Sequence, residues 1–195
     1  MYGYHRFFSA TSFSNAFGHF DEDRVRETKM AGCPCGGRLD VANYLRKPRG
    51  GPPGLEDSHS LRLSLCCARD GCRRRATPPS IRFLGRRVYF GAVVVLVSAM
   101  RHDITKLLAA KLYRLLGVSE RTLRRWRQWW LETFTASSFW TSERARFMPP
   151  VTQADLPRSL IERFLAPNGS LELVAVMRFL SPLTTGKAFA PEHAF

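Results

Sequence analysis

Two short groups of cysteines constrain most strongly what this chain of 195 residues can fold into. The cysteines are Cys33 and Cys35 in GCPCGG, and Cys66, Cys67 and Cys72 in CCARDGC. The stretch between the groups is rich in glycine and proline turn signals, and it predicts short strands over residues 38–45 and 60–65. Such a pattern is typical of a zinc ribbon, in which two turns each give two thiolates to one tetrahedral Zn²⁺.

A tetrahedral site needs four ligands, and the chain has five cysteines. We predict that Cys33, Cys35, Cys67 and Cys72 bind structural zinc. Neighbouring residues of a strand point to opposite faces, so Cys66 and Cys67 seldom bind the same ion, and the choice between them stays open. The alternative is five unligated thiols in a reduced protein. A site of four thiolates leaves no position for water, so we expect no zinc catalysis.

The charge of the chain favours a polyanionic partner. Its 30 Lys and Arg outnumber its 16 Asp and Glu, which gives a net charge of +14. Seven arginines and a single acid, Asp70, lie between residues 69 and 87. We predict that five of them contact DNA phosphate, and that the strand with the first three lies next to the DNA-reading helix. These five are Arg73, Arg74, Arg75, Arg86 and Arg87.

Leucines at helical spacing predict a helix before Gly117, and SERTLRRWRQWWLETF predicts a second helix capped by Ser119. The pair resembles a DNA-binding helix-turn-helix, whose second helix enters the major groove. The motif usually has a small residue where Tyr113 stands, so the helices must separate or cross differently. An amphipathic helix pair that binds no DNA is the alternative. The predicted DNA-binding residues of the second helix are Ser119, Arg121, Thr122, Arg124 and Arg125.

Three further segments complete the helical part. Residues 88–100 form an uncharged apolar run that fits a buried helix, with a strand as the competing interpretation. Trp126 and Trp130 are predicted to be core residues, whereas Trp129 is left open between core and base stacking. Residues 159–165 and 171–180 are expected to form two short helices.

These patterns predict a mainly α fold with a small β zinc ribbon on the N-terminal side and a helix-turn-helix in the middle. Residues 1–30 read as a poorly structured extension, and translation starts at Met1 or at Met30. Residues 31–80 form the ribbon, residues 81–135 the helix-turn-helix region, and residues 136–195 a helical tail of unknown role.

The order of ribbon, Thr-Pro-Pro, apolar helix and LGVSERTLRRW resembles the N-terminal DNA-binding region of bacterial insertion-sequence transposases. The resemblance covers Cys33 to Trp130. It implies binding to double-stranded DNA, together with a separate transposase subunit or as a homodimer. The alternatives are a chromosomal transcription regulator, which would act as a dimer on a palindrome, and a zinc-ribbon RNA-binding protein.

Catalysis and membrane insertion are not expected. Insertion-sequence transposases carry an Asp-Asp-Glu domain after the DNA-binding region, and the stretch after Trp130 is too short for one. The histidines are scattered and no nucleophile motif is recognisable, so we predict a non-enzyme; a truncated or partner-dependent transposase is the enzyme alternative. No secretory pattern is visible, and the run at 88–100 is too short to span a bilayer, so a cytoplasmic, nucleoid-associated protein is expected.

Overall fold

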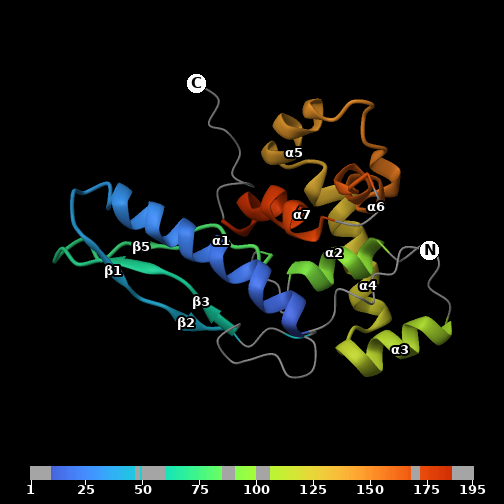
Figure 1. Cartoon of the computed structure of the whole chain (residues 1–195), viewed down its shortest axis with the longest axis horizontal. Helices are drawn as coiled ribbons and strands as arrows, with labels where there is room; N and C mark the ends of the chain where they lie inside the picture. The colour runs from blue at the N-terminus through green and yellow to red at the C-terminus, as the bar shows by residue number, and fades with distance from the viewer. Residues whose placement is uncertain are drawn as a thin grey trace.

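The computed structural model describes residues 10–46, 49, 60–84, 91–99, 106–167 and 172–185 (Figure 1). The protein is mainly α-helical, with a small antiparallel sheet on its N-terminal side, as the sequence predicted. Arg86 and Arg87, both predicted to contact DNA, lie outside the described residues. None of the helices in the described part combines the length and apolar character needed to cross a bilayer.

The first helix, α1 (Ala10–Ala31), corrects the expectation of a poorly structured N-terminal extension, which is wrong for residues 10–30. Ion pairs between residues three apart support its exposed surface, such as Arg26 with Asp23 at 2.9 Å. Val25 packs against the core of the ribbon, and Asp21 is buried. The C-terminal part of the helix is therefore anchored by contacts with residues far along the chain.

The ribbon consists of two small antiparallel sheets. One has the order β1-β4-β5, from β1 (Leu39–Val41), β4 (Leu65–Cys67) and β5 (Arg75–Ala76), and the other pairs β2 (Tyr44–Leu45) with β3 (Leu61–Arg62). The two strands predicted from the sequence are therefore each interrupted. Leu39 lies opposite Cys67 in the register, and these two residues form the ribbon core with Cys33 and Leu65.

Short helices follow the ribbon. The α-helices are α2 (Gly91–Ala99), α3 (Lys106–Leu116), α4 (Glu120–Gln128), α5 (Ser138–Glu143), α6 (Arg158–Ile161) and α7 (Leu173–Leu180). A π-helical segment, Trp129–Phe134, continues α4, and 3-10 turns cover Arg144–Arg146, Gln153–Asp155, Glu162–Phe164 and Ser181–Thr184. The helical interpretation of the apolar run is confirmed by α2. Gly91 packs closely on α7, and an added Cβ there would lie 2.7 Å from Cε of Met177, so the end of that side chain would have to move.

One hydrophobic core joins all the helices after the ribbon, from Ile81 to Leu183. Trp126 and Trp130 are buried in it, as predicted, and Trp129 is half-buried against it. The ring centres of Phe134 and Trp140 lie 4.9 Å apart. This contact connects the π-helical segment that continues α4 to α5. Residues 136–185 therefore share the core of the helix pair and are not a separate unit.

Asp21 connects α1 to the segment that leaves the ribbon. Its carboxylate accepts hydrogen bonds from Ser80 Oγ at 2.6 Å, from the Ile81 amide at 2.9 Å and from Arg82 Nε at 2.8 Å. Asp21 and Arg82 are both buried, at 1% and 7% exposure. Because a buried charge is costly unless it is paired, this contact fixes the position of α1 against the segment that follows the ribbon.

Candidate metal centre and basic surfaces

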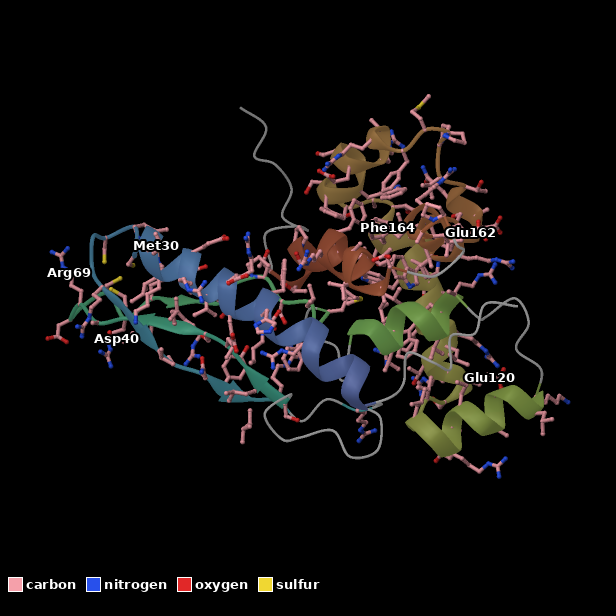
Figure 2. All side chains as sticks on the ribbon, in the orientation of Figure 1. Met30, Asp40, Arg69, Glu120, Glu162 and Phe164 are labelled. Carbon is pink, nitrogen blue, oxygen red and sulfur yellow. The ribbon has the colours of Figure 1, made fainter. Side chains whose placement is uncertain are left out.

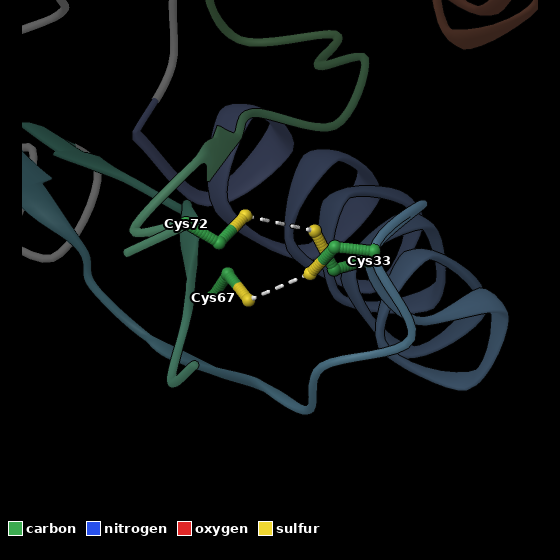
Figure 3. Close-up of side chains that lie close together, drawn as sticks. Cys33, Cys67 and Cys72 are labelled. Atoms are coloured by element: carbon green, nitrogen blue, oxygen red, sulfur yellow. Dashed lines mark hydrogen bonds between the residues drawn. The ribbon is translucent and has the colours of Figure 1, made fainter. Parts of the chain in front are cut away.

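Four cysteines meet at the tip of the ribbon, at the end of α1 (Figure 3). Their sulfur atoms all lie within 4.8 Å of one another. Cys33 Sγ is 3.7 Å from Cys72 Sγ, and Cys35 Sγ is 3.5 Å from Cys67 Sγ. A tetrahedral metal–thiolate centre with bonds of about 2.3 Å has sulfur–sulfur edges of roughly 3.8 Å. The cluster can therefore hold a metal ion, and it consists of the four cysteines predicted as ligands.

Tight turns on both sides bring the sulfurs together. In the first turn the Gly36 amide donates to the Cys33 carbonyl at 2.8 Å, and Gly36 has a φ of +79°. Gly71, in the second turn, has a φ of +81°. Gly37 has a different role, because an added Cβ there would lie only 2.6 Å from Cys67 Sγ and 3.3 Å from Cys35 Sγ. The backbone must pass this close to the sulfurs, and only glycine permits it.

The fifth cysteine lies outside the cluster. Cys66 pairs with Asp40 and Arg75 in the strand register, while its neighbour Cys67 pairs with Leu39 in the ribbon core. The Cys66 thiol lies 3.3 Å from the carbonyl oxygen of Arg73. The alternation of a strand thus turns Cys67 and not Cys66 toward the other sulfurs, which settles the choice that the sequence left open.

Two of the clustered thiols, Cys35 and Cys67, have pKa values shifted in opposite directions. The backbone amide of Gly37, followed by hydrogen bonds from Cys72, Cys33 and Cys67, lowers the pKa of Cys35 to about 6. The Arg69 amide favours the thiolate of Cys67, but burial and the neighbouring thiols outweigh it and raise the pKa of Cys67 to about 12. Negative charge in the metal-free cluster therefore gathers on Cys35, and a cation is needed to hold all four thiolates together.

Arg69 joins the two turns, a role that the sequence analysis did not assign. Its Nη1 donates to the carbonyl oxygen of Cys35 at 2.8 Å, although the two residues are 34 positions apart. The guanidinium thus lies beside the first turn while its own backbone belongs to the second. Its place in the cysteine-flanked sequence CCARDGC was the only signal available, and its neighbours Arg73 to Arg75 share that signal.

The helix pair has the connection that the sequence predicted. Gly117 turns the chain with a φ of +64°, Val118 is buried, and Ser119 caps α4 by accepting a hydrogen bond from the Thr122 amide at 3.3 Å. Tyr113 is 62% exposed, so its ring lies on the surface and not between the helices. The expectation that the two helices separate or cross differently because of Tyr113 stays a prediction. The buried side of α4 packs against α2.

The predicted DNA-binding arginines differ in the hydrogen bonds and ion pairs that their side chains make. Arg124 pairs with Glu120 at 2.6 Å on the surface of α4. Arg75 donates to the Ala42 carbonyl at 2.9 Å and to Ser64 Oγ at 3.0 Å. The remaining four are exposed, and their side chains make no hydrogen bond or ion pair with the part of the chain that the structure describes. These four are Arg73, Arg74, Arg121 and Arg125.

The two groups of arginines lie far apart. Figure 1 shows the ribbon tip at one end of the long axis and the pair α3–α4 at the other. Glu120, at the start of α4, and Arg69, in the ribbon, mark these ends in Figure 2. The expectation that the strand with Arg73 to Arg75 lies next to the second helix is therefore wrong, because α1 and the 80–84 segment hold the ribbon away from α4.

Among the described residues, the cysteine cluster is the one group of three or more His, Cys, Asp or Glu side chains placed to hold a metal ion. That the protein is not an enzyme stays a prediction. In comparisons with known proteins, the chain matches no family model, no curated protein and no solved structure. The features that bear on function are the cysteine cluster and two basic surfaces, one with Arg73 and Arg74 in the ribbon and one with Arg121 and Arg125 on α4.

Proposed function

We propose that this protein binds double-stranded DNA through α4 and that a structural zinc ribbon supports it, as in the N-terminal region of insertion-sequence transposases. The observation that carries the proposal is the surface of α4. Arg121 and Arg125 are exposed and, among the described residues, have no side-chain partner, while Leu123 and Trp126 fix the opposite side of the helix in the core. A rigid helix thus presents two unneutralised arginines to solvent.

The start of α4 favours an anion for a second reason. The first turn of a helix carries a partial positive charge, and its free amides face outward. Ser119 satisfies one of these amides through its cap, so the turn is well ordered. Arg121 and Arg125 are four positions apart and lie on one side of the helix. Residues at the N-terminal end of the second helix are those that contact base edges in a helix-turn-helix.

The proposed metal is zinc, with a structural role. Four thiolates in a closed tetrahedral arrangement are a typical structural Zn²⁺ site and leave no position for a substrate. Among the described residues, the fully buried part of the ribbon core has two large apolar side chains, Leu39 and Leu65, next to Cys33 and Cys67. A core of this size is too small to fold the ribbon alone, so metal binding supplies the missing free energy.

The chain as proposed contributes DNA recognition, and it acts with a separate transposase subunit or as a homodimer. Arg73 and Arg74, at the far end of the molecule, contact phosphate in this proposal. A duplex that reached both α4 and the ribbon would follow the long axis of the molecule. Such contacts add salt-sensitive affinity without specifying sequence.

Selection of bound sequences from a random duplex pool, followed by titration of the best duplex, tests the proposal. We expect Arg121→Ala/Arg125→Ala to weaken binding by at least about tenfold and to reduce the salt dependence by about one counterion per lost phosphate contact. The matched control is Arg144→Ala/Arg158→Ala, which removes the same charge from exposed sites outside α4. Equal losses in the two double variants would show that only net charge matters, and the assignment of α4 would fail.

A further inference from the structure

The ribbon exposes an unusual concentration of apolar surface. The described residues expose seven large apolar side chains, and three of them, Val41, Tyr44 and Leu45, lie within one stretch of the ribbon. Val41 and Leu45 are each 63% exposed and Tyr44 is 39% exposed. Single exposed apolar residues are ordinary. Tyr44 and Leu45 are neighbours on β2 and face opposite sides of the strand, so among these three the ring of Tyr44 is the one tied to the basic side of the ribbon, through Arg75.

Arg75 holds the aromatic ring of Tyr44 in place. Its guanidinium lies 5.4 Å from the centre of the Tyr44 ring, in a cation–π contact. The same guanidinium is fixed by hydrogen bonds to the Ala42 carbonyl and to Ser64 Oγ, at 2.9 Å and 3.0 Å. Tyr44 and Arg75 are therefore pre-ordered as a stacked pair on the surface, which lowers the entropy cost of binding a further flat group.

The surroundings of the pair are basic. Arg73 and Arg74 immediately precede Arg75, and they are exposed without a side-chain partner among the described residues. Asp40 is the acid on β1, and it is already paired with Arg38 at 2.9 Å. An occupant of this surface therefore has to offer both negative charge and apolar, flat groups.

Single-stranded nucleic acid has this combination. Its phosphates carry the charge, and its unpaired bases expose flat faces that stack on aromatic rings and on arginine. A duplex offers the same phosphates, but its base faces are covered by their neighbours. An acidic protein would match the charge but supplies no regular series of flat groups.

We infer that the ribbon surface around the Tyr44–Arg75 pair binds single-stranded nucleic acid, with one base stacked at Tyr44 and the adjoining phosphates held by Arg73 to Arg75. The inference rests on the proposed function only for the class of partner, since it does not involve α4. Arg73 and Arg74 are shared with the proposed duplex contact, whereas Tyr44 is not, and the ribbon tip lies far from α4 (Figure 1).

Fluorescence anisotropy with the zinc-loaded full chain and a labelled oligothymidine of about twelve nucleotides tests the inference. We expect Tyr44→Ala to weaken oligothymidine binding by about tenfold. Tyr44→Phe, which keeps the ring, is the matched control and is expected to stay within about twofold of the unchanged protein. Arg75→Gln, which removes the guanidinium that stacks on Tyr44, is a second test for use if Tyr44→Ala loses its zinc, and it is also expected to weaken binding. An oligouridine of the same length shows whether DNA or RNA is preferred.

The two claims fail separately. Arg121→Ala/Arg125→Ala is expected to lose duplex binding and to keep oligothymidine binding. If duplex binding is absent but oligothymidine binding depends on Tyr44, the proposed function is wrong and the present inference holds. If oligothymidine binds equally well to the unchanged protein, to Tyr44→Ala and to Arg75→Gln, or does not bind at all, the inference is overturned.

Discussion

The carboxylate of Asp21 lies 2.8 Å from Nε of Arg82, and water reaches neither side chain to any extent. A second buried arginine, Arg62 of β3, donates to the carbonyl oxygens of Leu63 and Pro78. Burial lowers the pKa of Arg62, and the charge of Asp21 acts against that shift. The Phe83 ring lies 5.8 Å from the Arg82 guanidinium and 6.0 Å from that of Arg62. The Asp21 carboxylate thus lies at a junction at which α1, the ribbon and the following segment meet.

Removing this acid is expected to destabilise the whole protein. Asp21→Ala leaves Arg82 buried without its carboxylate, which costs about 3–5 kcal/mol of the free energy of unfolding. Asp23→Ala is the matched control, because its partner Arg26 is exposed and such pairs contribute about 0–1 kcal/mol. Chemical denaturation of both variants with zinc present makes the comparison. Similar losses in the two variants would contradict the assignment of Asp21 to the junction.

Metal content distinguishes Cys66 from the four clustered cysteines. We expect Cys66→Ser to keep one zinc per chain, since its thiol faces the Arg73 carbonyl and not the cluster. Cys67→Ser removes a buried ligand and is expected to lose the metal and the fold of the ribbon. Elemental analysis of reduced protein and circular dichroism with and without chelator are the measurements. Zinc loss in Cys66→Ser alone would reverse the assignment.

Gly37 is expected to be indispensable for sulfur geometry. Gly37→Ala places a methyl group 2.6 Å from Cys67 Sγ, so the sulfur must move and metal affinity is expected to fall by about ten- to hundredfold. At Gly36 an added methyl group meets nothing within 4 Å, so Gly36→Ala adds only the backbone strain of its positive φ. The absorption spectrum of the Co²⁺ form reports ligand geometry. It is expected to change in Gly37→Ala and to be preserved in Gly36→Ala.

Ser119 allows helix capping to be separated from DNA binding. Ser119→Ala removes the acceptor for the Thr122 amide and is expected to cost about 1 kcal/mol of stability. Ser119→Asp restores a capping oxygen but places negative charge at the proposed phosphate surface. Thermal unfolding is therefore expected to rank Ser119→Asp close to the unchanged protein, while duplex titration ranks it below Ser119→Ala. The reverse order in DNA affinity would count against a phosphate contact at the start of α4.

Zinc affinity is expected to rise with pH. The raised pKa of Cys67, about 12, means that its thiol keeps its proton at neutral pH, and Cys33 is shifted in the same direction. Zinc has to displace both of these protons, which gives an affinity gain of at least roughly hundredfold per pH unit. Below about pH 6 the Cys35 thiolate also takes up a proton, so the dependence becomes steeper. Competition with a chromophoric chelator at several pH values measures the slope, which Cys66→Ser is expected to leave unchanged.

Local patterns explain the parts of this structure that could be predicted. Cysteine spacing and strand alternation restrict the ligands to a few residues close together in sequence, so the cluster could be anticipated. The cap at Ser119 and the buried positions Trp126 and Trp130 also follow from neighbouring residues on one helix. The π-helical segment Trp129–Phe134 was not predicted, because the apolar spacing fits an ordinary helical turn equally well.

The long-range features could not be read from the sequence. The position of α1 depends on contacts between Asp21 and residues 59 to 61 positions further along the chain. No local period in residues 10–31 signals such contacts. The distance between the ribbon and α4 was misjudged for the same reason, since segments that are adjacent in sequence order need not be adjacent in space. Only tertiary packing determines which basic residues share a surface.

The hydrogen bond between Asp21 and Ser80 closes a loop in the chain, because it joins two residues that are 59 positions apart in sequence. The ribbon lies within this loop, and the hydrogen bond is at its base. When the metal leaves, the two cysteine turns remain tethered at that base and do not separate as free chain ends. The entropy cost of bringing them together again depends only weakly on the length of the loop. Metal release is therefore expected to unfold the strands of the ribbon while the contact at its base persists, so the two cysteine turns stay close enough to bind metal again without refolding of the rest of the protein.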